Sequence, residues 1–145
     1  MSEEAARAVG DEREGGGLVG DWTVIGSITL AAVAESVGEA RHFAVGILGD
    51  GERAGTAELL ISEACTNSIV HSESRFGGKF TLTLMGAGDI LRCEVVDEGG
   101  PTVPTRREEE ELRDNGYGVM LIETLAGRSG HYIESGHLHT WFELD

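Results

Sequence analysis

The sequence predicts an α+β fold, a two-layer sandwich in which helices cover one face of a mostly antiparallel, mixed sheet. Five short apolar segments have the composition of strands, and three segments repeat their apolar residues at helical spacing. Short turns join two pairs of the strands. The elements follow in the order strand, helix, helix, strand, strand, loop, helix, strand, strand.

The N-terminal segment differs in composition from the rest of the chain. Residues 1–17 carry five acidic residues against two arginines, contain almost nothing large and apolar, and end in three glycines. We therefore expect a disordered acidic tail over 1–17 and one folded domain over 18–145. The first strand is predicted over 22–30, where β-branched residues dominate, with an interruption or bulge at Gly26.

Two helices are expected next. In the segment 36–51, Ser36 followed three residues later by Glu39 predicts an N-terminal capping box. Apolar residues recur there at helical spacing, and Gly49 is expected to end the helix. A longer helix is predicted over about 53–72.

The second half of the chain is predicted to begin with a hairpin and to end with two further strands. Its polar, charged stretch contains two prolines and is typical of a mobile loop. A short apolar helix follows the loop and is entered through glycines. The predicted elements are strands at 80–85 and 90–96 with a turn at 86–89, the loop at 101–115, the helix at 116–127, and strands near 131–134 and 140–144.

Composition argues against several classes of function. Lys and Arg total 11 and Asp and Glu total 26, so the formal net charge is −15. Because nucleic-acid affinity depends on Lys and Arg that displace counterions, we expect no nucleic-acid partner and no adhesion to an anionic membrane. Cys65 and Cys93 predict two buried thiols of a reducing compartment. No targeting signal or membrane-spanning run is apparent, which predicts a soluble cytoplasmic protein.

Three polar side chains interrupt the amphipathic pattern of the long helix. At ~100° per residue, one apolar stripe forms, and polar residues occupy the opposite side. Glu63, Asn67 and His71, each four residues apart, fall between apolar neighbours on both flanks. Because burial of an unpaired carboxylate or amide costs several kcal/mol, this ridge faces a wet cavity or a ligand, or it is a semi-exposed shoulder. The stripe comprises Ala57, Leu60, Ile61, Ala64 and Cys65, and the opposite side Glu58, Ser62, Thr66 and Glu73.

Two segments that contain glycine stand next to predicted elements: one follows a strand, and the other opens a helix. Asp97 ends a predicted strand and is followed by Gly99; a carboxylate there can accept a hydrogen bond from an exocyclic amine, and glycine lets backbone approach a flat ring. Gly116 and Gly118 open a helix, where backbone N–H groups converge on phosphates. Each pattern alone also occurs in ordinary turns. Together with the polar ridge, they predict a nucleotide pocket.

The predicted pocket is not a P-loop, because the chain has no GxxxxGK[ST] motif. Lysine is nearly absent, with Lys79 alone, so phosphate charge has to be offset by a metal ion, backbone amides or arginines. Arginines of the 101–115 loop are candidates for that role, and solvated surface charge is the alternative. They are Arg106, Arg107 and Arg113.

These motifs resemble those of a known superfamily. ELLISEACTNSIVHS, VVDEGG and NGYGVMLIETLA look like the N box and the two glycine boxes of the GHKL ATPases. Within that superfamily, roughly residues 20–145 are most similar to the small anti-sigma-factor serine/threonine kinases of actinobacterial type. The resemblance implies a Bergerat fold, with ATP and Mg²⁺ as cofactors. It also implies a sigma factor and a STAS-type anti-anti-sigma antagonist as partners, and homodimerisation.

The resemblance also implies roles for single residues. Glu63 corresponds to the catalytic general base, and Asn67 to the ligand of the Mg²⁺ that bridges the ATP phosphates. The other cofactor-binding residues that it implies are Asp97 and Gly99 at the adenine, Gly116 and Gly118 at the phosphates, and His71 and Thr140.

Several positions depart from the family pattern. Pro101 replaces the second glycine of the first glycine box, and Tyr117 and Val119 stand where arginine and leucine are typical. The loop is rich in glutamate at 108–111. Two functions follow as hypotheses: a kinase that phosphorylates a serine of the antagonist and sequesters a sigma factor, or a non-catalytic ATP-binding regulatory module that acts by sequestration alone.

Overall fold

The computed structural model describes residues 22–71, 77–97 and 116–145 of the chain. The predicted acidic tail at 1–17 and the predicted loop at 101–115 lie outside the described residues. The order of strands and helices is the one predicted from the sequence. The elements are β1 (Thr23–Ala31), α2 (Glu35–Leu48), α3 (Glu52–His71), β2 (Lys79–Ala87), β3 (Ile90–Asp97), α5 (Gly116–Leu125), β4 (Arg128–Glu134) and β5 (His137–Leu144).

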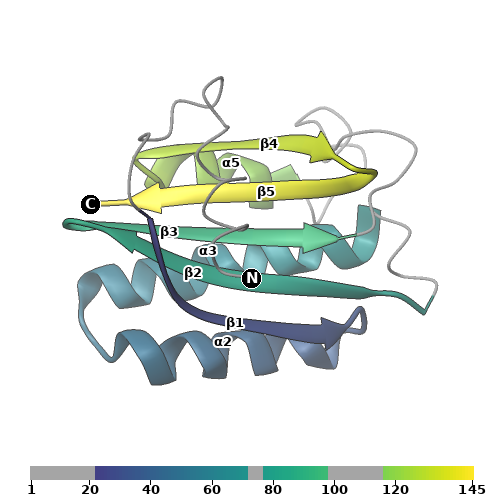
Figure 1. Cartoon of the computed structure of the whole chain (residues 1–145), viewed down its shortest axis with the longest axis horizontal. Helices are drawn as coiled ribbons and strands as arrows, with labels where there is room; N and C mark the ends of the chain where they lie inside the picture. Colours follow the sequence, from purple (N-terminus) through teal and green to yellow (C-terminus); the bar gives the residue numbers. More distant parts are fainter. Residues whose placement is uncertain (1–21, 72–76, 98–115) are drawn as a thin grey trace.

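The strands form one five-stranded sheet in the order β1-β2-β3-β5-β4. Each neighbouring pair of described strands is antiparallel. Figure 1 shows the three helices together behind one face of this sheet, with α2 along the β1 edge. The predicted two-layer α+β sandwich is therefore confirmed. The β4–β5 hairpin closes through Ser135 and Gly136, both at positive φ (57° and 81°), as a two-residue turn of this kind requires.

The predicted irregularity in β1 is present. The β1–β2 register shifts between Val24 and Gly26. An added Cβ at Gly26 would lie 2.6 Å from Ile47 Cδ1 and 3.1 Å from Phe43 Cζ, so the ends of these two side chains would have to shift. Glycine at this position therefore lets the C-terminal half of α2 pack directly on the strand backbone.

The predicted capping box of α2 is wrong. The helix begins at Glu35, its N-cap is Ala34 in the αR conformation, and no side chain caps it. The backbone already turns before Ser36, whose N–H donates to the Val33 carbonyl at 2.9 Å. Ser36 thus lies in the first turn and is buried, where it cannot act as an N-cap. The C-terminal prediction is confirmed: Gly49 has a φ of 78° and its N–H donates to the Val45 carbonyl.

The main core lies between the sheet and the helices. The predicted apolar stripe of α3, from Ala57 to Cys65, is almost fully buried and packs against alternate residues of β2 and β3. Both thiols are buried, as predicted, and burial raises the pKa of Cys65 to about 12 and that of Cys93 further. Within the described residues, no helix combines the length and the apolar character needed to cross a membrane.

The opposite face of the sheet carries a buried cluster of charged and aromatic side chains. Arg92 is 0% exposed, and its Nη1 donates to Glu143 Oε2 at 2.6 Å. Its guanidinium carbon lies 4.0 Å from the centroid of the Trp141 ring. Glu143 also accepts from Arg128 Nε at 3.0 Å. These pairs tie β3, β5 and β4 together across the sheet.

Candidate functional site

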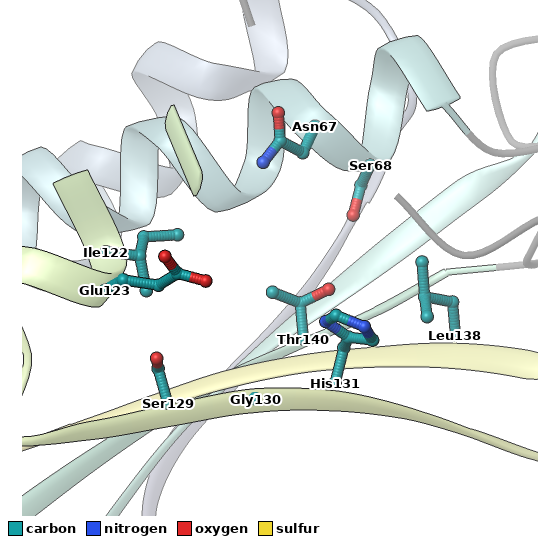
Figure 2. Close-up of a pocket in the computed structure, with 9 residues that line it drawn as sticks. All are labelled: Asn67, Ser68, Ile122, Glu123, Ser129, Gly130, His131, Leu138 and Thr140. Atoms are coloured by element: carbon teal, nitrogen blue, oxygen red, sulfur yellow. The ribbon is translucent and has the colours of Figure 1, made fainter. Parts of the chain in front are cut away.

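A cavity of about 100 Å³ opens between the helices and the C-terminal strands. Its walls come from α3, α5, β4 and β5, which Figure 2 shows converging around it. Because one water needs roughly 10–15 Å³ of such volume, the cavity accommodates a group of several heavy atoms. The lining residues are Asn67, Ser68, Ile122, Glu123, Ser129, Gly130, His131, Leu138 and Thr140.

The α3 wall of the cavity is polar although the helix around it is buried. Asn67 is 6% and Ser68 2% exposed, and both line the cavity. Asn67 comes one turn after Glu63 and next to the apolar stripe, so the packing of that stripe on the sheet directs its amide toward the cavity. The predicted ridge therefore presents Asn67 to a cavity. Ser68 was not predicted, because at helical spacing it falls on the face of the apolar stripe, which indicates packing and not a site.

Unlike Asn67, neither Glu63 nor His71 is found among the described residues that line the cavity. Glu63 is half-buried on α3 and is not among the residues that line the cavity. Burial raises the pKa of its carboxyl above the ordinary value of 4.5. A carboxylate with a raised pKa is a better proton acceptor near neutral pH. His71 ends α3, and its side chain lies outside the described part of the chain.

The floor of the cavity is the β4–β5 hairpin. His131 pairs with Thr140 in the register, and the alternation of side chains puts both on the helix-covered face. Figure 2 shows the Thr140 hydroxyl next to the His131 ring. Burial lowers the pKa of His131 below 6.5 against the opposing effect of the Glu123 carboxylate, so its imidazole is neutral at pH 7. The predicted residue Thr140 thus lines the cavity.

The remaining wall belongs to α5. Ile122 is buried and contributes apolar surface, whereas Glu123 is exposed. Figure 2 shows the Glu123 carboxylate turned toward the cavity. The sequence did not single out Glu123, Ser129 or His131. Period-2 alternation in β4 puts Ser129 and His131 on one face, but only the packing of α5 shows that this face borders a cavity.

The predicted adenine-recognising residue Asp97 ends β3 and is 1% exposed. Its register partner is Leu138, which lines the cavity, although Asp97 itself does not. Gly116 and Gly118 lie in the first turn of α5, as predicted. Gly99 and the loop arginines Arg106, Arg107 and Arg113 lie outside the described residues.

The donor set of the cavity suits a nucleotide with its metal ion. The part of the chain that the structure describes contains no group of three or more His, Cys, Asp or Glu residues able to hold a metal. The described residues therefore do not form a metal site built from protein ligands alone. A single amide oxygen, such as that of Asn67, fits Mg²⁺, which prefers oxygen ligands and keeps waters and substrate phosphates in its shell.

Comparison with known proteins assigns this arrangement to a family. The family of histidine kinase-like ATPase domains matches residues 29–139, which include α2, α3, β2, β3, α5, β4 and most of the residues that line the cavity. The chain belongs to this family. This ATPase domain places its cavity between the helix that carries Asn67 and the last two strands, and membership implies ATP as its nucleotide.

A solved structure shares the fold of this ATPase domain. The crystal structure of the RsbU and RsbW domains of Rv1364c from Mycobacterium tuberculosis matches with a TM-score of 0.58 and 16% sequence identity. The match covers 82% of this chain and 32% of that one, so the ATPase domain spans about a third of the length of that protein chain. At this identity the likeness establishes the fold alone. No curated protein matches the sequence.

Proposed function

We propose that this ATPase domain binds Mg-ATP in the cavity and is a serine/threonine protein kinase of the anti-sigma-factor type. It transfers the γ-phosphate of ATP to a serine of a STAS-type antagonist, and it sequesters a sigma factor in the cytoplasm, acting as a homodimer. One observation carries the proposal: the buried Asn67 amide faces a cavity one helical turn after the half-buried Glu63. The neighbour that contains RsbU and RsbW domains supports a role in partner switching.

Asn67 is the residue that would hold the metal. Its amide lies on the cavity wall, where the oxygen can ligate a hard cation. Mg²⁺ would supply neutralisation of the phosphate charge, the main requirement of phosphoryl transfer together with positioning. Ser68, next along α3, offers a buried hydroxyl to the same wall.

Glu63 serves as the general base. Four residues before Asn67, it lies about 6 Å along the helix axis and on the same side. Its raised pKa equips it to take the proton of the attacking serine hydroxyl. The serine oxygen then forms a bond to the γ-phosphorus, the bond to the bridging β–γ oxygen breaks, ADP leaves, and the proton stays on the Glu63 carboxyl.

The base of the nucleotide is assigned to the β3–β5 side of the cavity. Asp97 at the end of β3 accepts a hydrogen bond from the adenine amino group, while Thr140 and Leu138 border the ring. The first turn of α5, with Gly116 and Gly118, offers backbone N–H groups and the positive end of a ten-residue helix to the phosphates. Gly99 and His71 remain predictions from the sequence motifs.

A second function has an observation of its own. The Glu123 carboxylate is turned toward the cavity and opposes a triphosphate in a chain that already carries a net charge of −15. This favours a non-catalytic ATP-binding module that regulates its partner by sequestration alone.

Transfer from radiolabelled Mg-ATP to STAS-type proteins of the same genome separates these functions. We expect label on one serine of one antagonist, and about a hundredfold or greater loss of transfer in Glu63→Gln. The matched control is Glu58→Gln on the same helix, whose carboxylate pairs with Arg41 at 3.7 Å outside the cavity. ATP binding without transfer by the wild type assigns the non-catalytic module, and absence of ATP binding in calorimetry refutes both functions.

A further inference from the structure

The strand β1 forms an edge of the sheet that nothing in its own sequence protects. Among the described strands it pairs with β2 alone, and Figure 1 shows it as the outermost strand. Natural edge strands are shielded by charged residues, prolines or short length. The nine residues of Thr23–Ala31 include no charged residue and no proline. The bulge at Val24 and Gly26 leaves the run from Ser27 to Ala31 in regular register.

A groove of about 680 Å³ runs beside this edge. The C-terminal half of α2 packs tightly on Gly26, but its N-terminal half leaves space over Ile28 and Leu30, which with Phe43 are partly buried and form the apolar lining. Gly38 keeps the groove open, since an added Cβ would meet nothing within 4 Å. We call this the β1–α2 groove; its lining residues are Ile28, Leu30, Glu35, Gly38, Glu39, His42 and Phe43.

The rim of the β1–α2 groove is acidic. Glu35 and Glu39 are exposed one turn apart on α2, and neither has an ion-pair partner among the residues that the structure describes. By contrast, Arg41 on the same helix pairs with Glu58 of α3. Two free carboxylates beside an apolar floor, in a chain of net charge −15, attract a cationic partner.

We propose that the β1–α2 groove binds an extended segment of a partner protein in which apolar residues alternate with Arg or Lys. The segment adds to β1 as a further strand, so that main-chain hydrogen bonds provide affinity and side chains provide specificity. Its apolar side chains pack on Ile28, Leu30 and Phe43, and its basic side chains pair with Glu35 and Glu39.

Charge favours this occupant over two others. A second copy of the chain would bring a β1 edge without basic residues and a second acidic rim, so like charges would face each other. A nucleic acid would be repelled by the same carboxylates. The groove shares no residue with the nucleotide cavity, and the two lie toward opposite edges of the sheet. The proposal therefore does not depend on ATP binding.

The test uses a fluorescein-labelled seven-residue peptide of alternating valine and arginine, titrated with the full chain and followed by anisotropy. Gly38→Phe fills the groove, and we expect it to weaken binding by about tenfold or more. Gly46→Phe is the matched control: it also replaces a glycine of α2 with open space around its Cβ, but outside the groove, and it should bind like the wild type.

The charge requirement is tested by Glu35→Lys with Glu39→Lys, against Asp50→Lys with Glu134→Lys, which change the net charge equally at exposed positions elsewhere. The first pair should weaken binding by about tenfold, and the second by about twofold at most.

Changes in the peptide probe the occupant without altering the protein. A valine–glutamate peptide, and a valine–arginine peptide with alternate backbone amides methylated, should each bind at least about tenfold more weakly. Equal binding of the methylated peptide would overturn strand addition. If Gly38→Phe bound the peptide as tightly as the wild type, the assignment to this groove would be overturned. The same would follow if the two double charge variants bound the peptide equally tightly.

Discussion

Replacement of Asn67 by alanine should remove most of the stabilisation that Mg-ATP gives this domain. A ligand that binds only the native state at about 100 times its Kd stabilises it by about 2.7 kcal/mol. For a chain of this size, about 4 °C in Tm corresponds to each kcal/mol. The wild type should therefore gain about 10 °C with Mg-ATP at this concentration.

The alanine variant loses the only amide that the described residues present to the cavity. If loss of the metal ligand weakens binding about a hundredfold, the same ATP concentration equals the new Kd, and the stabilisation falls to about 0.4 kcal/mol. The corresponding gain in Tm is about 2 °C. The large difference follows from the placement of Asn67 on the cavity wall, at 6% exposure, where no bulk water substitutes for it.

Differential scanning fluorimetry with ATP and Mg²⁺, and with ATP and EDTA, measures both effects after calorimetry has set the wild-type Kd. Ser62→Ala is the matched control, since Ser62 lies on the same helix, its hydroxyl donates to the Glu58 carbonyl at 3.1 Å, and it does not line the cavity. The control should keep the full magnesium-dependent gain. An equal gain in Asn67→Ala would refute the assignment of Asn67 as the metal ligand.

Three further predictions concern stability. Arg92→Met leaves the buried Glu143 carboxylate without its 2.6 Å partner, so urea unfolding should show a loss of about 3–5 kcal/mol; a loss below about 1 kcal/mol would contradict this role. Gly26→Ala places a methyl group 2.6 Å from Ile47 Cδ1 and should cost about 1 kcal/mol in the same assay, whereas no loss would mean that the end of the Ile47 side chain shifts aside without cost. Because burial raises the pKa of Glu63, the native state binds more protons than the unfolded state just above pH 4.5, and stability falls as the pH rises through the folded pKa. Glu63→Gln should remove this fall in urea midpoints between pH 4 and 7, and an unchanged pH dependence would show that the carboxyl is not buried.

The sequence was sufficient to predict the elements because their signals are local. Alternation, helical periodicity and glycines identified each strand and helix, including the bulge near Gly26 and the end of α2 at Gly49. The predicted capping box was wrong because the local pattern did not account for tertiary packing. Ser36 has the sequence context of an N-cap, but the helix begins before it and Ser36 is buried.

The candidate site was predicted only where a polar residue interrupts an apolar pattern. Asn67 was found in this way, whereas Thr140 was implied only by the family resemblance; both line the cavity. Ser68, Glu123 and His131 were missed, because their position depends on how α5 packs over the β4–β5 hairpin. When side chains from three different elements line one cavity, the residue spacing within each element does not predict that they meet.

The sequence alone determined which segments become strands and helices, and which helix carries the acid and amide of the family motif. The segments are predictable because local conformational preference and burial on one face both produce a characteristic spacing of apolar residues. Only the tertiary structure decided that Arg92 and Glu143 are buried as a pair on the far face of the sheet, that His131 and Thr140 lie side by side on the floor of a cavity, and that β1 is left as an open edge. Each of these depends on strand order and on contacts between residues distant in the chain, which local spacing does not encode.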